Sequence, residues 1–86
     1  MKVQVQASYW HKIIDHYNNV LNERFYGQVY TPTVQYYMRH AFEAATRQAK
    51  ARETHPAWHV PLQLRFEPLK HRFIIEAADP SQLELL

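Results

Sequence analysis

Apolar residues recur with helical spacing over residues 9–25. On a helical wheel these residues separate into an apolar arc and a polar arc, which predicts an amphipathic helix with one buried side. The apolar arc holds Tyr9, Trp10, Ile13, Ile14, Tyr17, Val20, Leu21 and Phe25. Ser8 is the expected N-cap, and Gly27 follows as a residue that tolerates the left-handed conformation of a helix end.

A second helical pattern covers residues 32–51. Thr31 followed by Pro32 supplies a capping hydroxyl and a proline at the first helical position. The expected apolar side holds Val34, Tyr37, Met38, Ala41, Phe42, Ala44, Ala45 and Ala49. The opposite side holds Tyr36, Arg39, His40, Glu43, Thr46, Arg47 and Lys50. Arg39, Glu43 and Arg47 are one turn apart, so we expect them to pair along this helix.

Elsewhere the apolar positions alternate, as in half-buried strands. This pattern predicts a strand at Lys2–Ala7 and a β-hairpin that joins residues 60–67 to residues 72–77 through the turn at 67–70. The inward side is expected to hold Val3, Val5, Leu62, Leu64, Phe66, Phe73 and Ile75. Gln63, Arg65, Arg72 and Ile74 are expected to face outward, and Ile74 indicates that something covers this face.

The end of the chain carries a second capping signal. Asp79-Pro80-Ser81-Gln82 is typical of a capping box and predicts a short final helix with Leu83 and Leu86. The complete order, β-α-α-β-β-(α), predicts an α+β fold with two layers. In it a three-stranded antiparallel sheet carries both long helices on one face.

Composition limits the chemistry of the chain. Its 86 residues predict a single domain over residues 1–86, with one glycine and no cysteine. A glycine-rich phosphate loop, a cysteine zinc site and a disulfide framework are therefore excluded. Among the six histidines, His55 and His59 have the spacing of helical metal ligands, but Pro56 disfavours a helix there and no acidic residue completes a zinc pattern. We therefore expect hydrogen-bonding or solvated histidines, no metal and no cofactor. His11 and Asp15, one helical turn apart, are expected to form a surface pair.

The chain is mildly basic, and its positive charge is unevenly distributed. The formal net charge is +2, and most cations fall between residues 39 and 72. No apolar stretch approaches the roughly 20 residues that a membrane helix needs. We expect a cytoplasmic protein without a membrane partner, since cysteine is also absent.

Tyr36 is the most informative single residue. It falls on the polar side of the second helix among Arg39, His40, Arg47 and Lys50, where a ring beside cations suits a protein contact or the stacking of unpaired bases. A tyrosine packed under a neighbouring loop or a partner subunit is the simpler interpretation. The candidate binding residues are Tyr36, Arg39, His40, Arg47, Lys50, Arg65 and Arg72.

The order of elements resembles that of two known families. KH domains share it and carry a G-x-x-G loop between their first two helices; here that loop reads Gly27-Gln28-Val29-Tyr30, with tyrosine in place of the second glycine. The mRNA-cleaving toxins of bacterial toxin–antitoxin modules also place two helices after a first strand. Arg65, His71 and Arg72 match their catalytic residue types. Order alone assigns the chain to neither family.

Three hypotheses follow from these patterns. The first is a small non-enzymatic protein–protein interaction or regulatory module that self-associates, as a homodimer, and binds a partner through the second helix and the adjacent sheet surface. The second is RNA or single-stranded DNA binding through the basic face of that helix. The third is a toxin-like ribonuclease that uses His71 with Arg65 or Arg72.

Overall fold

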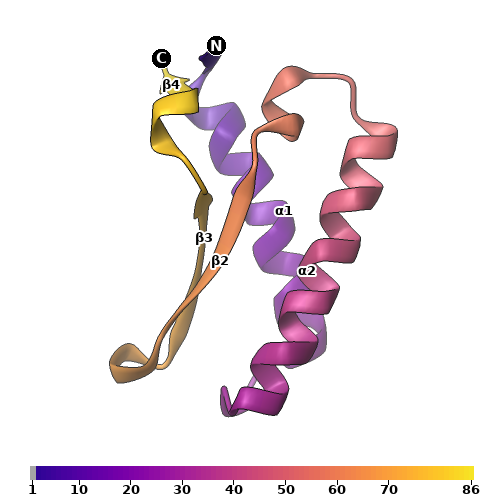
Figure 1. Cartoon of the computed structure of the whole chain (residues 1–86), viewed down its shortest axis with the longest axis vertical. Coiled ribbons are helices and arrows are strands. Elements are labelled where there is room, and N and C mark those ends of the chain that lie inside the picture. The colour runs from indigo at the N-terminus through magenta and orange to yellow at the C-terminus, as the bar shows by residue number, and fades with distance from the viewer. Residues whose placement is uncertain (1) are drawn as a thin grey trace.

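The fold consists of two long helices, a β-hairpin and a second, smaller sheet (Figure 1). The computed structural model describes residues 2–86. The helices and strands are β1 (Val3–Val5), α1 (Ala7–Phe25), α2 (Pro32–Arg52), β2 (Leu62–Glu67), β3 (Arg72–Ala77) and β4 (Leu83–Leu85). Three short 3₁₀ helices connect them: η1 (Pro56–His59), η2 (Pro68–Lys70) and η3 (Pro80–Gln82).

Both predicted long helices are confirmed, but only α2 begins with a side-chain capping bond. α1 begins at Ala7, and Gln6 precedes it without a side-chain capping bond. The predicted Ser8 cap is wrong, because Ser8 already lies within the first turn. At α2 the Thr31 hydroxyl accepts a hydrogen bond from the Val34 amide at 3.2 Å, with Pro32 at the first position as predicted. Gly27, after α1, has a φ of +79°, a conformation that suits glycine.

The hairpin also forms where the sequence predicts it. β2 pairs antiparallel with β3, with Leu62 opposite Ala77 and Leu64 opposite Ile75. The turn contains η2 and ends at His71, which has a left-handed φ of 48°. Leu64 and Ile75 are buried, so the alternating pattern directs the expected side of the hairpin toward the helices.

The predicted three-stranded antiparallel sheet is wrong. Residues 2–86 form two separate two-stranded sheets, because β1 pairs with β4 rather than with the hairpin. This pairing is parallel, with Val3 opposite Leu83 and Val5 opposite Leu85. The Leu86 amide donates to the Val5 carbonyl at 2.9 Å and extends the contact past the end of β4.

The predicted final helix is wrong for a related reason. Asp79 does act as a cap, and its side chain accepts from the Ser81 amide at 3.0 Å. The capped segment is only the single turn η3, and the chain then becomes extended. Leu83 and Leu85 flank Glu84 with the period of a strand, and β1 offers backbone groups for them to pair with.

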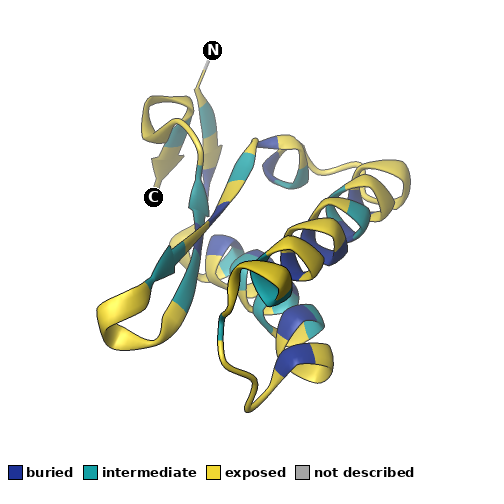
Figure 2. Cartoon of the chain, turned by 60° about the horizontal axis from the view of Figure 1, so that its bottom comes forward, coloured by how far each residue is buried: buried dark blue, intermediate teal, exposed yellow. Residues whose placement is uncertain are grey.

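The core lies where α1 meets α2 and the hairpin. Buried positions line the facing sides of the two helices in Figure 2, and the largest fully buried side chains are Tyr17, Ile13, Leu21 and Met38. The Tyr17 ring meets Phe42 of α2 edge-on at 5.6 Å. Burial raises the pKa of the Tyr17 hydroxyl, an effect that the nearby Thr46 hydroxyl partly offsets.

The two-stranded hairpin is narrower than the layer of two helices beside it. The hairpin lies over α1, and α2 runs along the β2 side of the hairpin (Figure 1). Two strands therefore cover one helix well and leave the second helix next to a strand edge. This mismatch creates the surface described below.

The two helix starts predict a contrast in stability. Thr31→Ala removes the hydroxyl that accepts from the Val34 amide, and we expect it to lower the free energy of unfolding by about 1 kcal/mol. Ser8→Ala removes no capping bond and should change it by less than about 0.5 kcal/mol. Urea denaturation of both variants provides the comparison. Equal losses would contradict the assignment of the caps.

Candidate interaction surface

Aromatic rings stand in solvent on the first half of α2. Tyr36 is 58% exposed, as its place on the polar arc predicts, and its ring meets His40 edge-on at 4.4 Å. Tyr37 is 57% exposed, so its predicted place on the apolar side is wrong. Its ring lies 5.5 Å from that of Tyr36. Exposed paired rings are costly to hydrate and are typical of contact surfaces.

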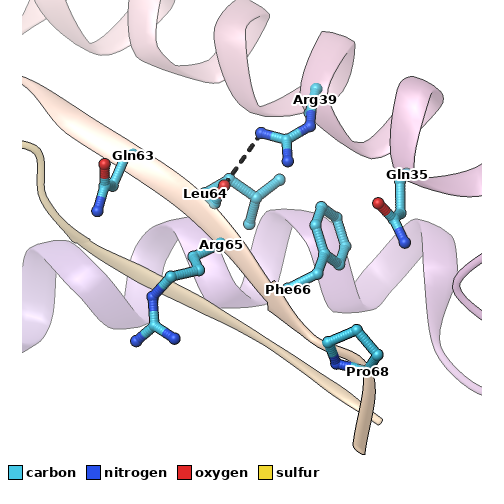
Figure 3. A pocket seen from close by; sticks show the side chains of 7 residues that line it. All are labelled: Gln35, Arg39, Gln63, Leu64, Arg65, Phe66 and Pro68. Carbon is cyan, nitrogen blue, oxygen red and sulfur yellow. Dashed lines mark hydrogen bonds between the residues drawn. The ribbon is translucent and has the colours of Figure 1, made fainter. Parts of the chain in front are cut away.

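Arg39 is also exposed, but its guanidinium contacts the hairpin rather than these rings. Its guanidinium crosses from α2 to the hairpin and donates to the Leu64 carbonyl at 3.0 Å (Figure 3). The same group lies 5.2 Å from the centre of the Phe66 ring, in a cation–π contact. The side chain thus bridges α2 and β2.

An open groove lies between α2 and β2 around this bridge. One part has a volume of 350 Å³ and is lined by Gln35, Arg39, Gln63, Leu64, Arg65, Phe66 and Pro68. A second part, of 290 Å³, shares Arg39, Gln63 and Leu64 and adds Leu62, Phe42 and Glu43. The two parts share Arg39, Gln63 and Leu64, so they adjoin along β2, and Figure 3 shows the residues of the first part.

Other cations of α2 remain exposed beyond the groove. Arg47 and Lys50 are exposed, and neither forms an ion pair within residues 2–86. The predicted pairing of Glu43 with Arg39 and Arg47 is wrong, because Glu43 forms no ion pair within residues 2–86. The Arg39 guanidinium donates to the Leu64 carbonyl instead. α2 therefore presents unneutralised positive charge on the side away from the core.

Arg65 and Arg72 lie on the hairpin and are neutralised there. The Arg65 Nε donates to Glu76 Oε1 at 2.8 Å, and its Nη1 lies 3.5 Å from Glu67 Oε2. Arg72 pairs with Glu67. Hydrogen bonds from Arg72 and Arg65 lower the pKa values of Glu67 and Glu76 respectively. These two arginines therefore do not join the positive charge of α2.

The histidines serve local contacts. His11 lies 3.4 Å from Asp15 in the expected surface pair. His55 Nδ1 accepts from the Ala57 amide at 3.0 Å and caps η1, while His59 Nε2 hydrogen bonds to the Glu53 carbonyl at 2.9 Å. His71 stacks on the Tyr30 ring at 4.6 Å. His71 therefore packs the hairpin turn against the connection between α1 and α2.

An exposed apolar end escaped the sequence analysis. Tyr26 and Val29 in the α1–α2 connection and Leu69 in the hairpin turn are largely exposed. The Tyr30–His71 stack joins these two segments, so both lie at the same end of the molecule. The sequence does carry a signal for the high exposure of Leu69. This residue is the central one of the turn between two strands, and such turns lie at the protein surface.

The groove residues Gln35, Phe42 and Phe66 were also missed as site residues. Phe42 and Phe66 carry the apolar signal of a core position, and nothing local to either residue shows that α2 lies beside an open strand edge. This surface exists because the hairpin sheet has no third strand within residues 2–86. Strand partnership is a long-range property that alternation within one strand does not report.

Two classes of site find no support within the described residues. Residues 2–86 contain no group of three or more histidine, aspartate or glutamate side chains that could hold a metal ion. In the same range, neither helix combines the length and the apolarity that crossing a membrane requires. Comparisons with protein-family models, with curated proteins and with solved structures give no match.

The hairpin ion pairs predict an acid-dependent stability. The pKa values of Glu67 and Glu76 are lowered from 4.5 in the folded state, so the folded state binds fewer protons than the unfolded chain. The stabilisation is thus complete above about pH 5 and is lost as pH falls through the lowered pKa values. Glu76→Gln should reduce the fall in thermal midpoint between about pH 5 and pH 3.

Glu43→Gln is the matched control, because Glu43 forms no ion pair within residues 2–86. Its thermal midpoint should follow the wild-type pH profile. If the Glu76→Gln profile is also parallel to wild type, the Arg65–Glu76 pair does not contribute to the acid dependence.

Proposed function

We propose that the chain is a non-enzymatic interaction module that binds a protein partner through α2 and the adjacent surface of β2. The observation that carries this proposal is the groove between α2 and β2, with exposed Tyr36 and Tyr37 on the same helix. Hydrophobic contact with the rings supplies binding free energy. Arg47 and Lys50 add charge that steers an acidic partner.

Self-association is a part of this proposal. Tyr36, Tyr37, Tyr26 and Val29 are large apolar side chains in solvent, and a second copy would remove such surface from water. Ile74, which stands opposite Arg65 on the outer face of the hairpin, is half-buried and offers a smaller apolar contact. Light scattering after size-exclusion chromatography at tens of micromolar tests this point, and a strict monomer would remove self-association from the proposal.

A double substitution on α2 tests partner binding. Tyr36→Ala with Arg47→Ala removes an exposed ring and an exposed charge, neither of which contributes to the core. We expect the immobilised variant to lose, by about tenfold or more, a protein that the wild-type chain retains from host lysate after nuclease treatment. The thermal midpoint should stay within about 2 °C of wild type.

The matched control is Asn19→Ala with Glu23→Ala, which alters exposed positions of α1. This variant should retain the partner as the wild type does. Equal retention by both double variants would contradict a role for Tyr36 and Arg47. A large drop in the thermal midpoint of the α2 variant would show that the two side chains are structural.

Nucleic-acid binding is the second candidate, favoured by one observation. Arg47 and Lys50 lack carboxylate partners within residues 2–86 and share α2 with the exposed Tyr36 ring, which suits contact with phosphates and unpaired bases. It predicts a gel shift with mixed single-stranded oligonucleotides that weakens steeply as salt rises. The toxin-like ribonuclease has less support, because Arg65 and Arg72 each hold a carboxylate and His71 stacks on Tyr30.

A further inference from the structure

The backbone of β2 has a free edge that faces the groove. The Pro61 carbonyl accepts from the Ala78 amide, so the backbone groups of residue 61 point toward the β3 side. Backbone groups in a strand alternate in direction, and those of Gln63, Arg65 and Glu67 therefore also point toward β3. The groups of Leu62, Leu64 and Phe66 point the other way, which agrees with the bond from Arg39 to the Leu64 carbonyl.

This edge is only partly satisfied within residues 2–86. The amides of Leu62, Leu64 and Phe66 donate to no backbone or side-chain acceptor in that range. Arg39 supplies the partner for one carbonyl, that of Leu64. A row of unpaired strand groups is a template for one more strand, and extended peptides bind many domains in this way.

The groove supplies the space and the apolar contacts for such a strand. It follows the edge from Leu62 at one end to Phe66 and Pro68 at the other, with Phe42 of α2 beside it. Alternate side chains of an added strand would point down onto this apolar lining. Its other side chains would point outward, level with Gln63 and Arg65.

The charged residues that line the groove favour particular side chains on an added strand. Arg39 is a full positive charge that contacts a neutral carbonyl and a ring, and it forms no ion pair within residues 2–86. An added strand would take over the Leu64 carbonyl and free the guanidinium. A carboxylate on the inward residue opposite Leu64 would then form a charge-assisted bond with it. Glu43 lines the other part of the groove, so a second acid there is disfavoured.

We propose that the β2 edge accepts an extended protein segment as an added antiparallel strand, with an acidic residue that pairs with Arg39. The proposal rests on the proposed function, since it names the partner segment that the interaction module recognises. The strand lies between β2 and α2 and converts the hairpin into a three-stranded sheet. Its backbone bonds give affinity, and the acid at one position gives selectivity.

A second copy of the whole chain fits this edge less well. Antiparallel pairing of two β2 strands requires a two-fold axis perpendicular to the sheet. α2 lies on the β2 side of the hairpin (Figure 1), so this axis would bring the α2 helices of both copies toward the same edge. A single extended segment carries no such helix to that edge.

A peptide titration followed by protein NMR tests the proposal. The probe is an acetylated, amidated peptide Ser-Thr-Val-Thr-Glu-Thr-Val-Thr-Ser, whose valines and glutamate share one face. We expect a dissociation constant on the order of 1 mM or tighter, with amide shifts concentrated at Leu62, Leu64 and Phe66. Replacing the glutamate by glutamine should weaken binding by about tenfold.

Arg39 supplies the decisive comparison. In Arg39→Gln the glutamate and glutamine peptides should bind within about twofold of each other, because the partner charge is gone. Arg47→Gln, an exposed cation of the same helix, should keep the tenfold preference. Methylating the glutamate nitrogen, which faces β2, should abolish binding, whereas methylating the preceding threonine nitrogen should not.

Each outcome decides the matter. No shifts with any peptide, shifts centred on Tyr36 and Arg47, or an undiminished glutamate preference in Arg39→Gln would overturn the proposal. If Arg39→Gln does not fold, Arg39→Met replaces it and should also bind the two peptides within about twofold of each other, because methionine carries no charge. Failure of the peptides to bind at β2, with partner retention through Tyr36 intact, would overturn this inference and leave the proposed function standing. Peptide binding at β2, with partner retention unaffected by Tyr36→Ala and Arg47→Ala, would keep the edge site and remove the role of Tyr36 and Arg47 from the proposed function.

Discussion

The open edge of β2 is the constraint on which the surface of this protein depends. Backbone amides and carbonyls need partners, and a two-stranded hairpin satisfies only one side of each strand. At β2 the other side faces α2, and Arg39 reaches across to meet one carbonyl. The edge is therefore protected by a side chain, which can move, rather than by a strand, which cannot move without unfolding part of the sheet.

Cationic side chains divide into two groups with different roles. Arg65 and Arg72 sit among Glu67 and Glu76 and stabilise the hairpin. Arg47 and Lys50 of α2 are exposed and have no carboxylate partners within residues 2–86. The carboxylates that pair with Arg65 and Arg72 weaken the case for a catalytic cluster on the hairpin. The exposed cations of α2 favour recognition along that helix.

The sequence predicts most of the local structure because local structure depends on neighbours along the chain. The apolar arc of α1, the Thr31–Pro32 start of α2 and the alternation around Leu64 all predict the observed elements. The failures are long-range. β1 and β4 lie at opposite ends of the sequence, and no pattern within Leu83–Leu85 indicates that β1 is its pairing strand. The strong Asp79 cap also favours a helix that stops after one turn.

The same limit applies to the candidate surface. Tyr36 is exposed as the helical wheel predicts, because its position depends only on the helix. Arg39 lies on the same predicted polar arc, yet its contact depends on how α2 is placed against β2. The groove therefore follows from packing between elements, and its residues Gln35 and Phe66 have no distinguishing local pattern.

Amide hydrogen exchange along β2 tests the central claim most directly. In the free protein, the account predicts alternation: the amides of Gln63, Arg65 and Glu67 exchange slowly, and those of Leu62, Leu64 and Phe66 exchange much faster. Uniform protection of all these amides would show that the β2 edge already has a partner, and it would contradict the account.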